Sequence, residues 1–436
     1  MNHSLALLAL ALGPALAAEP PNLEERARAL VTSLGKEDYA AASKDFDDAM
    51  NKAMPADKFA ETWRGLVKQV GALKKQGKAT AEKVQKYDVV WVACEFEKAT
   101  WYTRVVFDDQ GRVTGLQFRP TGPAGEYKAP AYVKRGSFKE SEVRVGEGEW
   151  ALPGTLTVPV GDGPFPAVVL VHGSGPHDRD ETLGPSRPFR DLAWGLASQG
   201  IAVLRYEKRT KEHGAKFAKA KDATVKEEVI DDALAAVALL RKTKGIDGKR
   251  VFVLGHSLGA MAAPKIGERD PEIAGLILMA GPSRNMGDVL IEQLDYVLSV
   301  NPSEAQKAAV AKLKAQAEKL KDPKLSRQTP AEEMPFGATA VYWLSMRDLA
   351  PVETALKIKQ PLLILQGGRD YQSTMDDFDG WKKALAGRQG ATLKSYAKLN
   401  HLFAEGEGKA TPAEYQKEGH VTKEVVDDIA GWVKGH

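Results

Sequence analysis

The sequence predicts an α/β protein: a doubly wound, mostly parallel sheet with a helical lid insertion, preceded by a small α+β domain. From about residue 137 onward, short apolar runs rich in β-branched residues alternate with helical segments, as in parallel sheets that helices cover on both faces. Before residue 120, helical segments precede alternating strands. About 80 residues separate two apolar runs between Gly281 and Lys359, and an insertion of that length near strand ends is most often a lid.

The first 18 residues are predicted to be a signal peptide. An apolar core from Leu5 to Leu12 precedes Ala15-Leu16-Ala17, a small-x-small cleavage site. The apolar run is shorter than the ~20 residues that a transmembrane helix needs, and no cysteine follows the site to carry a lipid. We therefore expect export to the periplasm or the extracellular space, without a stable membrane anchor.

Composition and charge are those of a globular protein without a nucleic-acid partner. Of the 436 residues, 43% are hydrophobic and 27% are charged, which is ordinary for a globular protein of two domains. The net charge is +3 and no long basic run is present, so no nucleic-acid partner is expected. The single cysteine, Cys94, lies in an alternating run and is expected to be a buried strand residue. Composition does not define the oligomeric state.

The small domain is predicted to span residues 19–120. Three helices are expected at its start, in 22–34, 36–50 and 55–73, and strands follow at 84–97, 100–107 and 112–119. A stretch rich in proline and glycine, 121–136, is the predicted linker.

The second domain is predicted to span residues 137–436. It is expected to begin with two antiparallel strands, near 138–145 and 149–159. Five buried strands are then expected at PAVVLVHG, IAVLRYE, KRVFVLGHS, AGLILMAG and PLLILQGG. Helices between them are expected at 188–199, 224–243 and 258–269, and the lid at about 282–358.

Ser257 is the candidate nucleophile, because it lies in the pattern G-x-S-x-G between an apolar strand and a helix of small residues. A serine raised on such a strand-to-helix turn has a strained backbone. Side chains at the two flanking positions would clash, and Gly255 and Gly259 occupy them. Backbone N–H groups at the start of the helix favour a developing negative charge.

A serine hydroxyl needs a base, and that base needs an acid that fixes its tautomer. His401 is the candidate base, since it follows a predicted strand; His420 precedes the last helix and is interpreted as a cap or surface residue. Asp370 is the candidate acid, in the loop beyond a buried strand, where catalytic groups of open α/β sheets lie. The acids at 376–379 are interpreted as the first turn of a helix.

The stretch VVLVHGSGPHDRDETLG, residues 168–184, offers an alternative interpretation as a metal site. Its two histidines, His172 and His177, are five residues apart across glycine and proline and share no helical face. No matching ligand cluster appears elsewhere, so neither a metal nor another cofactor is expected. Asp178, Arg179 and Asp180 are expected to hold the loop through ion pairs and backbone hydrogen bonds.

These motifs resemble the α/β-hydrolase superfamily over residues 137–436. The stretch from HGSGPHDRDET to LRYEKRT, together with LGHSLGAMAAP, is similar to bacterial secreted esterases related to dienelactone hydrolases and serine aminopeptidases. Residues 22–120 resemble a bacterial domain of unknown function with a cystatin-like or NTF2-like shape. The resemblance implies an oxyanion hole formed by the backbone N–H groups of Ser174 and Leu258.

The resemblance implies a serine carboxylesterase acting on small-molecule esters with short-to-medium or aromatic acyl groups. A serine peptidase or amidase uses the same triad, and a non-catalytic binding protein is a further alternative that has no need of all three residues. In the lid, Phe336, Tyr342 and Trp343 are candidates for an acyl pocket, with core packing as an equal alternative. Tyr206, which ends a strand, is a further candidate for substrate contact.

Overall fold

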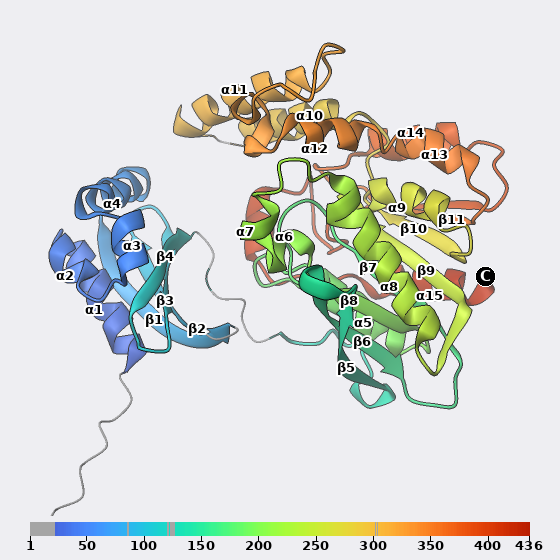
Figure 1. The fold of residues 1–436 in the computed structure, drawn as a ribbon, viewed down its shortest axis with the longest axis horizontal. Coiled ribbons are helices and arrows are strands. Elements are labelled where there is room, and N and C mark those ends of the chain that lie inside the picture. Colours follow the sequence, from blue (N-terminus) through green and yellow to red (C-terminus); the bar gives the residue numbers. More distant parts are fainter. Residues whose placement is uncertain (1–21, 85–86, 120–121, 123–126, 301, 303) are drawn as a thin grey trace, which may run out of the picture. The chain divides into compact units, whose positions relative to one another are not determined.

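The fold is that of a computed structural model of the whole chain (Figure 1). The structure describes residues 22–84, 87–119, 122, 127–300, 302 and 304–436. The predicted signal peptide therefore lies outside the described residues. The chain divides into two compact units, 1–123 and 124–436. No described helix is both long and apolar enough to cross a membrane.

Four helices open the described part of the first unit. They are α1 (Leu23–Gly35), α2 (Tyr39–Ser43), α3 (Asp48–Ala53) and α4 (Ala56–Val70). The side chain of Asn22 caps α1 by accepting the Glu25 N–H. The single helix expected over 36–50 is instead two short helices, because Asp47 accepts the Met50 N–H at 2.6 Å and starts α3 anew.

The sheet of this unit has four antiparallel strands in sequential order, one more than predicted. They are β1 (Leu73–Val84), β2 (Tyr87–Phe96), β3 (Thr100–Phe107) and β4 (Val113–Arg119). The sequence of β1 is rich in lysine and buries only Ala79, so it lacks the alternation that predicts a strand. Cys94 is fully buried in β2, which confirms the prediction for this residue.

The sheet of the second unit has eight strands. They are β5 (Phe138–Val145), β6 (Leu152–Pro159), β7 (Phe165–Val171), β8 (Ala202–Tyr206), β9 (Ile246–His256), β10 (Gly275–Met279), β11 (Leu362–Gly367) and β12 (Ala391–Tyr396). Their spatial order is β12-β11-β10-β9-β7-β8-β6-β5. The six strands from β7 to β12 are parallel to one another, whereas β5 and β6 pair antiparallel at one edge. The predicted doubly wound sheet is confirmed.

Helices cover both faces of this sheet (Figure 1). On one face α5 (Pro188–Ala197) and α15 (Lys423–Gly435) share a core with the sheet. On the other face lie α8 (Asp231–Lys242), α9 (Leu258–Arg269) and α14 (Met375–Ala384). A π-helical turn, Lys226–Ile230, leads into α8. Two short helices, α6 (Arg209–Glu212) and α7 (Gly214–Phe217), follow β8.

The insertion after β10, which is predicted to be a lid, is largely helical and is called the lid here. It contains α10 (Met286–Ser299), α11 (Glu304–Lys319) and α12 (Ala340–Arg347), with 3₁₀ turns at Ala331–Glu333 and Pro335–Gly337. These helices lie together at one end of the unit (Figure 1). The last helix, α13 (Pro351–Lys357), instead packs against α9 and α14 and buries Ala355 in the sheet's core. Of the predicted lid, about 282–358, the part up to residue 347 is therefore separate from the helices that pack on the sheet.

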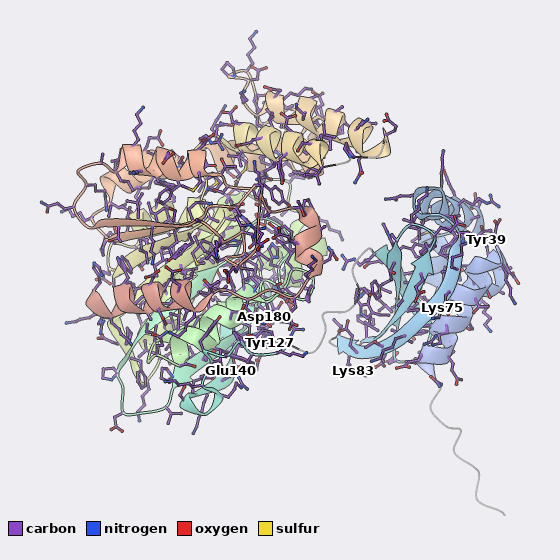
Figure 2. The ribbon with its side chains drawn as sticks, turned by 180° about the vertical axis from the view of Figure 1, so that it is seen from behind. Tyr39, Lys75, Lys83, Tyr127, Glu140 and Asp180 are labelled. Carbon is purple, nitrogen blue, oxygen red and sulfur yellow. The ribbon has the colours of Figure 1, made fainter. Side chains whose placement is uncertain are left out.

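The predicted linker, 121–136, differs from the structure over its second half. Tyr127, labelled in Figure 2, donates its hydroxyl to Asp191 of α5 at 2.5 Å. Tyr132 donates to the Val421 carbonyl oxygen at 2.7 Å. Because aromatic rings with satisfied hydroxyls pack well against an apolar core, residues 127–136 belong to the second unit.

Candidate active site

Ser257 stands at the turn between β9 and α9. Its backbone has φ 53° and ψ −114°, a strained conformation for a residue with a side chain. A Cβ atom on Gly255 would come within 2.1 Å of the Gly259 carbonyl oxygen. One on Gly259 would come within 2.1 Å of the Val171 carbonyl oxygen. Both glycines are therefore required by lack of space, as the pattern predicts.

Asp370 and His401 meet beside this turn. His401 Nδ1 donates to Asp370 Oδ2 at 2.7 Å, and both side chains are buried. The other carboxylate oxygen of Asp370 accepts the backbone N–H groups of Gln372 at 2.7 Å and Ser373 at 3.2 Å. These bonds fix the carboxylate and leave His401 Nε2 for another partner. Ser257 and His401 line the same cavity.

The alternatives to these residues serve other purposes. His420 lies against Asp191, with its Nδ1 3.1 Å from the carboxylate, and does not line the cavity. Asp377 lies in the first turn of α14, where it forms a capping box with Thr374 and an ion pair with Arg284 of the lid segment. The interpretation of 376–379 as a helix start is confirmed.

The loop after β7 brings Ser174 to the cavity. The flanking backbone groups are held on both sides: the Gly173 N–H donates to Glu181 Oε1 at 2.6 Å, and the Gly173 carbonyl oxygen accepts from Lys208 Nζ at 2.7 Å. His177 Nε2 donates to the Ser174 carbonyl oxygen at 2.6 Å. Among the described residues, no acceptor takes the N–H of Ser174 or of Leu258.

Glu181 and His256 form a buried charged pair next to Ser257. Glu181 Oε2 lies 2.9 Å from His256 Nδ1, and His256 Nε2 donates to the His401 carbonyl oxygen at 2.9 Å. Burial opposes ionisation of Glu181, but His256 outweighs it and lowers the pKa of Glu181 to about 2. Burial likewise opposes charge on His256, and Glu181 overrides it to raise the pKa of His256.

The two histidines of the loop contact backbone oxygens. His172 Nε2 donates to the Asp178 carbonyl oxygen at 3.0 Å, and burial lowers the pKa of His172 to about 3, so its ring is neutral. The ring of His177 stacks 6.4 Å from that of His172. Within the described ranges, no three His, Cys, Asp or Glu side chains gather as a metal site would require.

Ion pairs hold the loop, as the sequence predicts. Arg179 pairs with Glu207 at 2.8 Å and with Glu142 at 2.7 Å. Asp180 pairs with Arg190 at 2.6 Å and with the buried guanidinium of Arg205. Figure 2 labels Asp180 and Glu140, the two carboxylates that neutralise Arg205.

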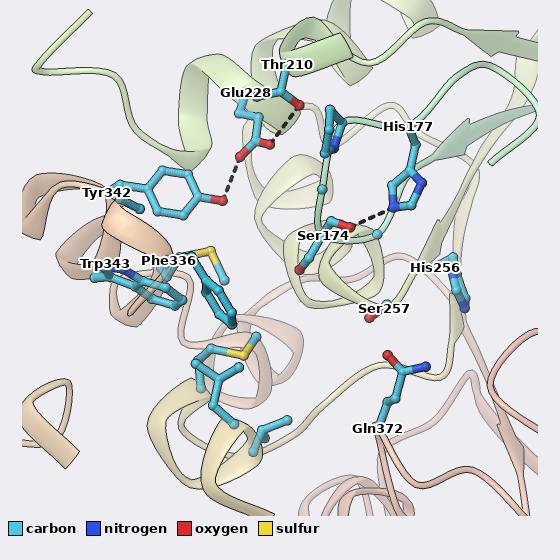
Figure 3. A pocket seen from close by; sticks show the side chains of 18 of the residues that line it. Ser174, His177, Thr210, Glu228, His256, Ser257, Phe336, Tyr342, Trp343 and Gln372 are labelled. Carbon is cyan, nitrogen blue, oxygen red and sulfur yellow. Dashed lines mark hydrogen bonds between the residues drawn. The ribbon is translucent and has the colours of Figure 1, made fainter. Parts of the chain in front are cut away.

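A cavity of about 770 Å³ extends from Ser257 to the lid (Figure 3). The lid contributes Met286, Val289, Leu290, Phe336, Tyr342, Trp343 and Met346 to its lining. The three predicted aromatic residues are therefore all at the cavity, with Phe336 67% exposed. Tyr206 is not: it is buried in the core, with its ring 5.4 Å from that of His172, and the expectation that it contacts substrate is not met.

Three charged residues around the site are buried: Glu181, Lys208 and Glu228. The sequence places Glu181 in the polar loop and Lys208 after a strand, at the rim, but it does not predict that they are buried; Glu228 was missed. Each lies in a polar stretch of the kind that is usually exposed to solvent. The signal for Lys208 is its position two residues after a buried strand, where side chains reach the site in open α/β sheets, and it predicts a role at the rim. Glu228 carries no such signal.

Comparisons with known proteins identify relatives of both units. A family model described as serine aminopeptidase, S33, matches residues 163–407, and one described as a protein of unknown function (DUF3887) matches residues 27–116. The chain is 39% identical to esterase EstD of Thermotoga maritima over 415 residues, which cover 94% of this chain and 95% of that protein.

Similar solved structures include two esterases. Est1E from Butyrivibrio proteoclasticus is 14% identical, with a TM-score of 0.46 over 68% of this chain and 99% of that chain. An esterase of Pyrococcus furiosus is 16% identical, with a TM-score of 0.44 over 71% and 99%. Because the S33 model matches more than half of the chain and the Thermotoga relative matches nearly all of it, the protein belongs to the serine aminopeptidase S33 family of hydrolases.

Proposed function

We propose that the protein is a serine carboxylesterase in which Ser257, His401 and Asp370 form a catalytic triad. The observation that carries the proposal is the 2.7 Å bond from His401 to Asp370 beside a serine on a strained strand-to-helix turn. Esterase EstD, a relative over almost the whole chain, supports esters as the substrate class.

The proposed reaction proceeds through an acyl-enzyme. His401 Nε2 takes the proton of Ser257, whose oxygen attacks the ester carbonyl carbon. The N–H groups of Ser174 and Leu258 stabilise the negative oxygen of the tetrahedral intermediate. His401 then protonates the leaving alcohol, and water hydrolyses the acyl-enzyme by the same route.

The cavity favours an apolar acyl group of short-to-medium length or an aromatic one. Its lid side presents methionine, leucine, valine and aromatic side chains, which exclude water from an acyl chain. Phe336 is exposed at this cavity and has φ 56°, a rare conformation for a bulky residue. Strain of this kind is often kept where a side chain must be aimed at a ligand.

The family description raises aminopeptidase activity as the alternative. An aminopeptidase must bind a free ammonium group, and a carboxylate is the side chain suited to it. Of the carboxylates lining the described part of the cavity, Glu181 faces His256 and Glu228 pairs with Lys208. Both negative charges are already neutralised, which favours esters.

A fluorophosphonate probe and two substrate series test the proposal. Wild type is expected to be labelled at Ser257 and to hydrolyse nitrophenyl esters, including hydroxycinnamoyl esters, while Ser257→Ala does neither. Amino-acid anilides are expected to react far more slowly than esters. Faster turnover of anilides than of esters would show that the protein is a peptidase. Absence of labelling would contradict both activities.

A further inference from the structure

Lys208 is buried behind the loop that carries Ser174. It follows β8, is 2% exposed and donates to the Gly173 carbonyl oxygen at 2.7 Å. That carbonyl and the Ser174 N–H belong to the same peptide group. Lys208 does not line the cavity, so it reaches the reaction only through this peptide.

A chain of charged and polar contacts links Lys208 to the lid. Lys208 Nζ lies 2.9 Å from Glu228 Oε1, and Glu228 Oε2 accepts the hydroxyl of Tyr342 in α12 at 2.6 Å. Thr210 also donates to Glu228 at 3.3 Å. Figure 3 shows Tyr342 and Thr210 reaching Glu228 from opposite sides. Burial opposes charge on Glu228, but Lys208 overrides it and lowers the pKa of Glu228.

The peptide between Gly173 and Ser174 needs such an anchor. Gly173 precedes Ser174, and Gly175 follows it with φ 102°. The backbone on both sides of Ser174 therefore has the wide conformational range of glycine. A flip of this peptide would turn the carbonyl oxygen toward the cavity and the N–H away from it. A cation bonded to the carbonyl oxygen opposes the flip and also polarises the group, since hydrogen bonds in series strengthen one another.

We propose that Lys208 is a positioning residue for the oxyanion hole: it holds and polarises the Gly173–Ser174 peptide. Glu228 and Tyr342 connect this anchor to the lid. The inference rests on the proposed function, because the Ser174 N–H matters only where an oxyanion forms beside Ser257. It explains why a lysine and a glutamate are both buried there, although burying two charges costs more than a surface pair does.

The test compares Lys208→Met, which keeps most of the side chain's length but not its charge, with Lys208→Arg, which keeps the charge. Loss of a whole oxyanion donor costs about 10²–10³ in kcat, and we expect loss of its anchor to cost about tenfold. KM should change less than kcat, and Lys208→Arg should recover most of the lost kcat. Lys394→Met, which removes an ion-paired lysine of β12 outside the cavity lining, is the matched control.

Binding of a trifluoromethyl ketone gives a second measurement, which loss of packing alone would not change. Its adduct with Ser257 places a negative oxygen in the oxyanion hole, and ¹³C NMR of the labelled carbon reports the pKa of that oxygen. Lys208→Met should raise this pKa and weaken the adduct by the same factor as kcat. Lys394→Met should leave both unchanged.

The outcomes separate the inference from the proposed function. If wild type is labelled at Ser257 but Lys208→Met keeps its kcat and adduct pKa, only stability depends on Lys208 and the inference is overturned. If wild type is not labelled, the proposed function fails first and the inference fails with it. Should Lys208→Met not fold, Glu228→Gln, which removes the countercharge, replaces it; an unchanged adduct pKa there overturns the inference.

Discussion

Glu181 lies between the Gly173 N–H and His256, with one carboxylate oxygen 2.6 Å from the nitrogen of Gly173 and the other 2.9 Å from His256 Nδ1. One buried carboxylate thus joins the loop after β7 to the end of β9, directly before Ser257. His256 passes the connection on to the backbone of His401. Three segments that carry the proposed site are tied to one another by this pair.

Glu181→Gln should destabilise the protein in a pH-dependent way. The raised pKa of His256 gives stability that is fully present below its ordinary value of 6.5 and is lost as the pH rises through the raised pKa. The lowered pKa of Glu181 gives stability present above 4.5 and lost as the pH falls toward about 2. The difference in unfolding free energy, about 3 kcal/mol, should therefore be largest between these two ordinary values.

Urea unfolding at several pH values measures this difference. Glu149→Gln is the control, because Glu149 is largely exposed in its ion pair with Lys216 and should give a small difference at every pH. A difference for Glu181→Gln that does not vary with pH would show that the pair is not charged in the folded protein.

Asp370→Asn should lower kcat by about 10⁴ while the fold is kept, because an amide no longer fixes the His401 tautomer that accepts the serine proton. The backbone N–H groups that bond to Asp370 still find the amide oxygen, so stability should change little. Steady-state kinetics with a nitrophenyl ester measure the loss. Asp379→Asn, an exposed acid of α14, should retain full activity, and equal losses in both variants would contradict the assignment.

Asp180→Ala should destabilise the protein by about 3–5 kcal/mol, since it leaves the buried guanidinium of Arg205 with Glu140 as its one remaining carboxylate. Turnover should fall as well, because the loop that carries Ser174 loses an anchor. Thermal unfolding and ester kinetics measure the two effects. Unchanged fold and turnover would refute the role given to this loop's ion pairs.

Gly259→Ala should prevent folding, because the added Cβ would lie 2.1 Å from a backbone oxygen that cannot move aside. Gly431→Ala is the matched control: it lies in α15 with nothing within 4 Å of an added Cβ, and helix propensity should stabilise it by about 0.5–1 kcal/mol. Soluble yield and circular dichroism distinguish the two. A well-folded Gly259→Ala protein would mean that the turn is not constrained by space.

The parts of this protein that could be predicted from the sequence are those whose signal is local. The strand, turn and helix around Ser257 are encoded in adjacent residues, and chain order then selects Asp370 and His401. By contrast, β1 is a half-exposed strand without alternation. Lys208 meets its partner Gly173 across 35 positions, so its place after a strand predicts that it lies near the site but not which group it contacts. The second half of the predicted linker differs from the structure for a similar reason. Its glycine and proline residues indicate a linker, and nothing local shows that the two tyrosines among them pack against the second unit.

The strained backbone of Ser257 has a consequence for directed evolution. Its φ of 53° costs about 1–3 kcal/mol, and glycine would adopt the same conformation with less strain. Position 257 is thus a place where thermostability and turnover are selected in opposite directions. A library screened by heat resistance alone would enrich proteins that keep the cavity, the lid and the loop, and that have lost the proposed nucleophile.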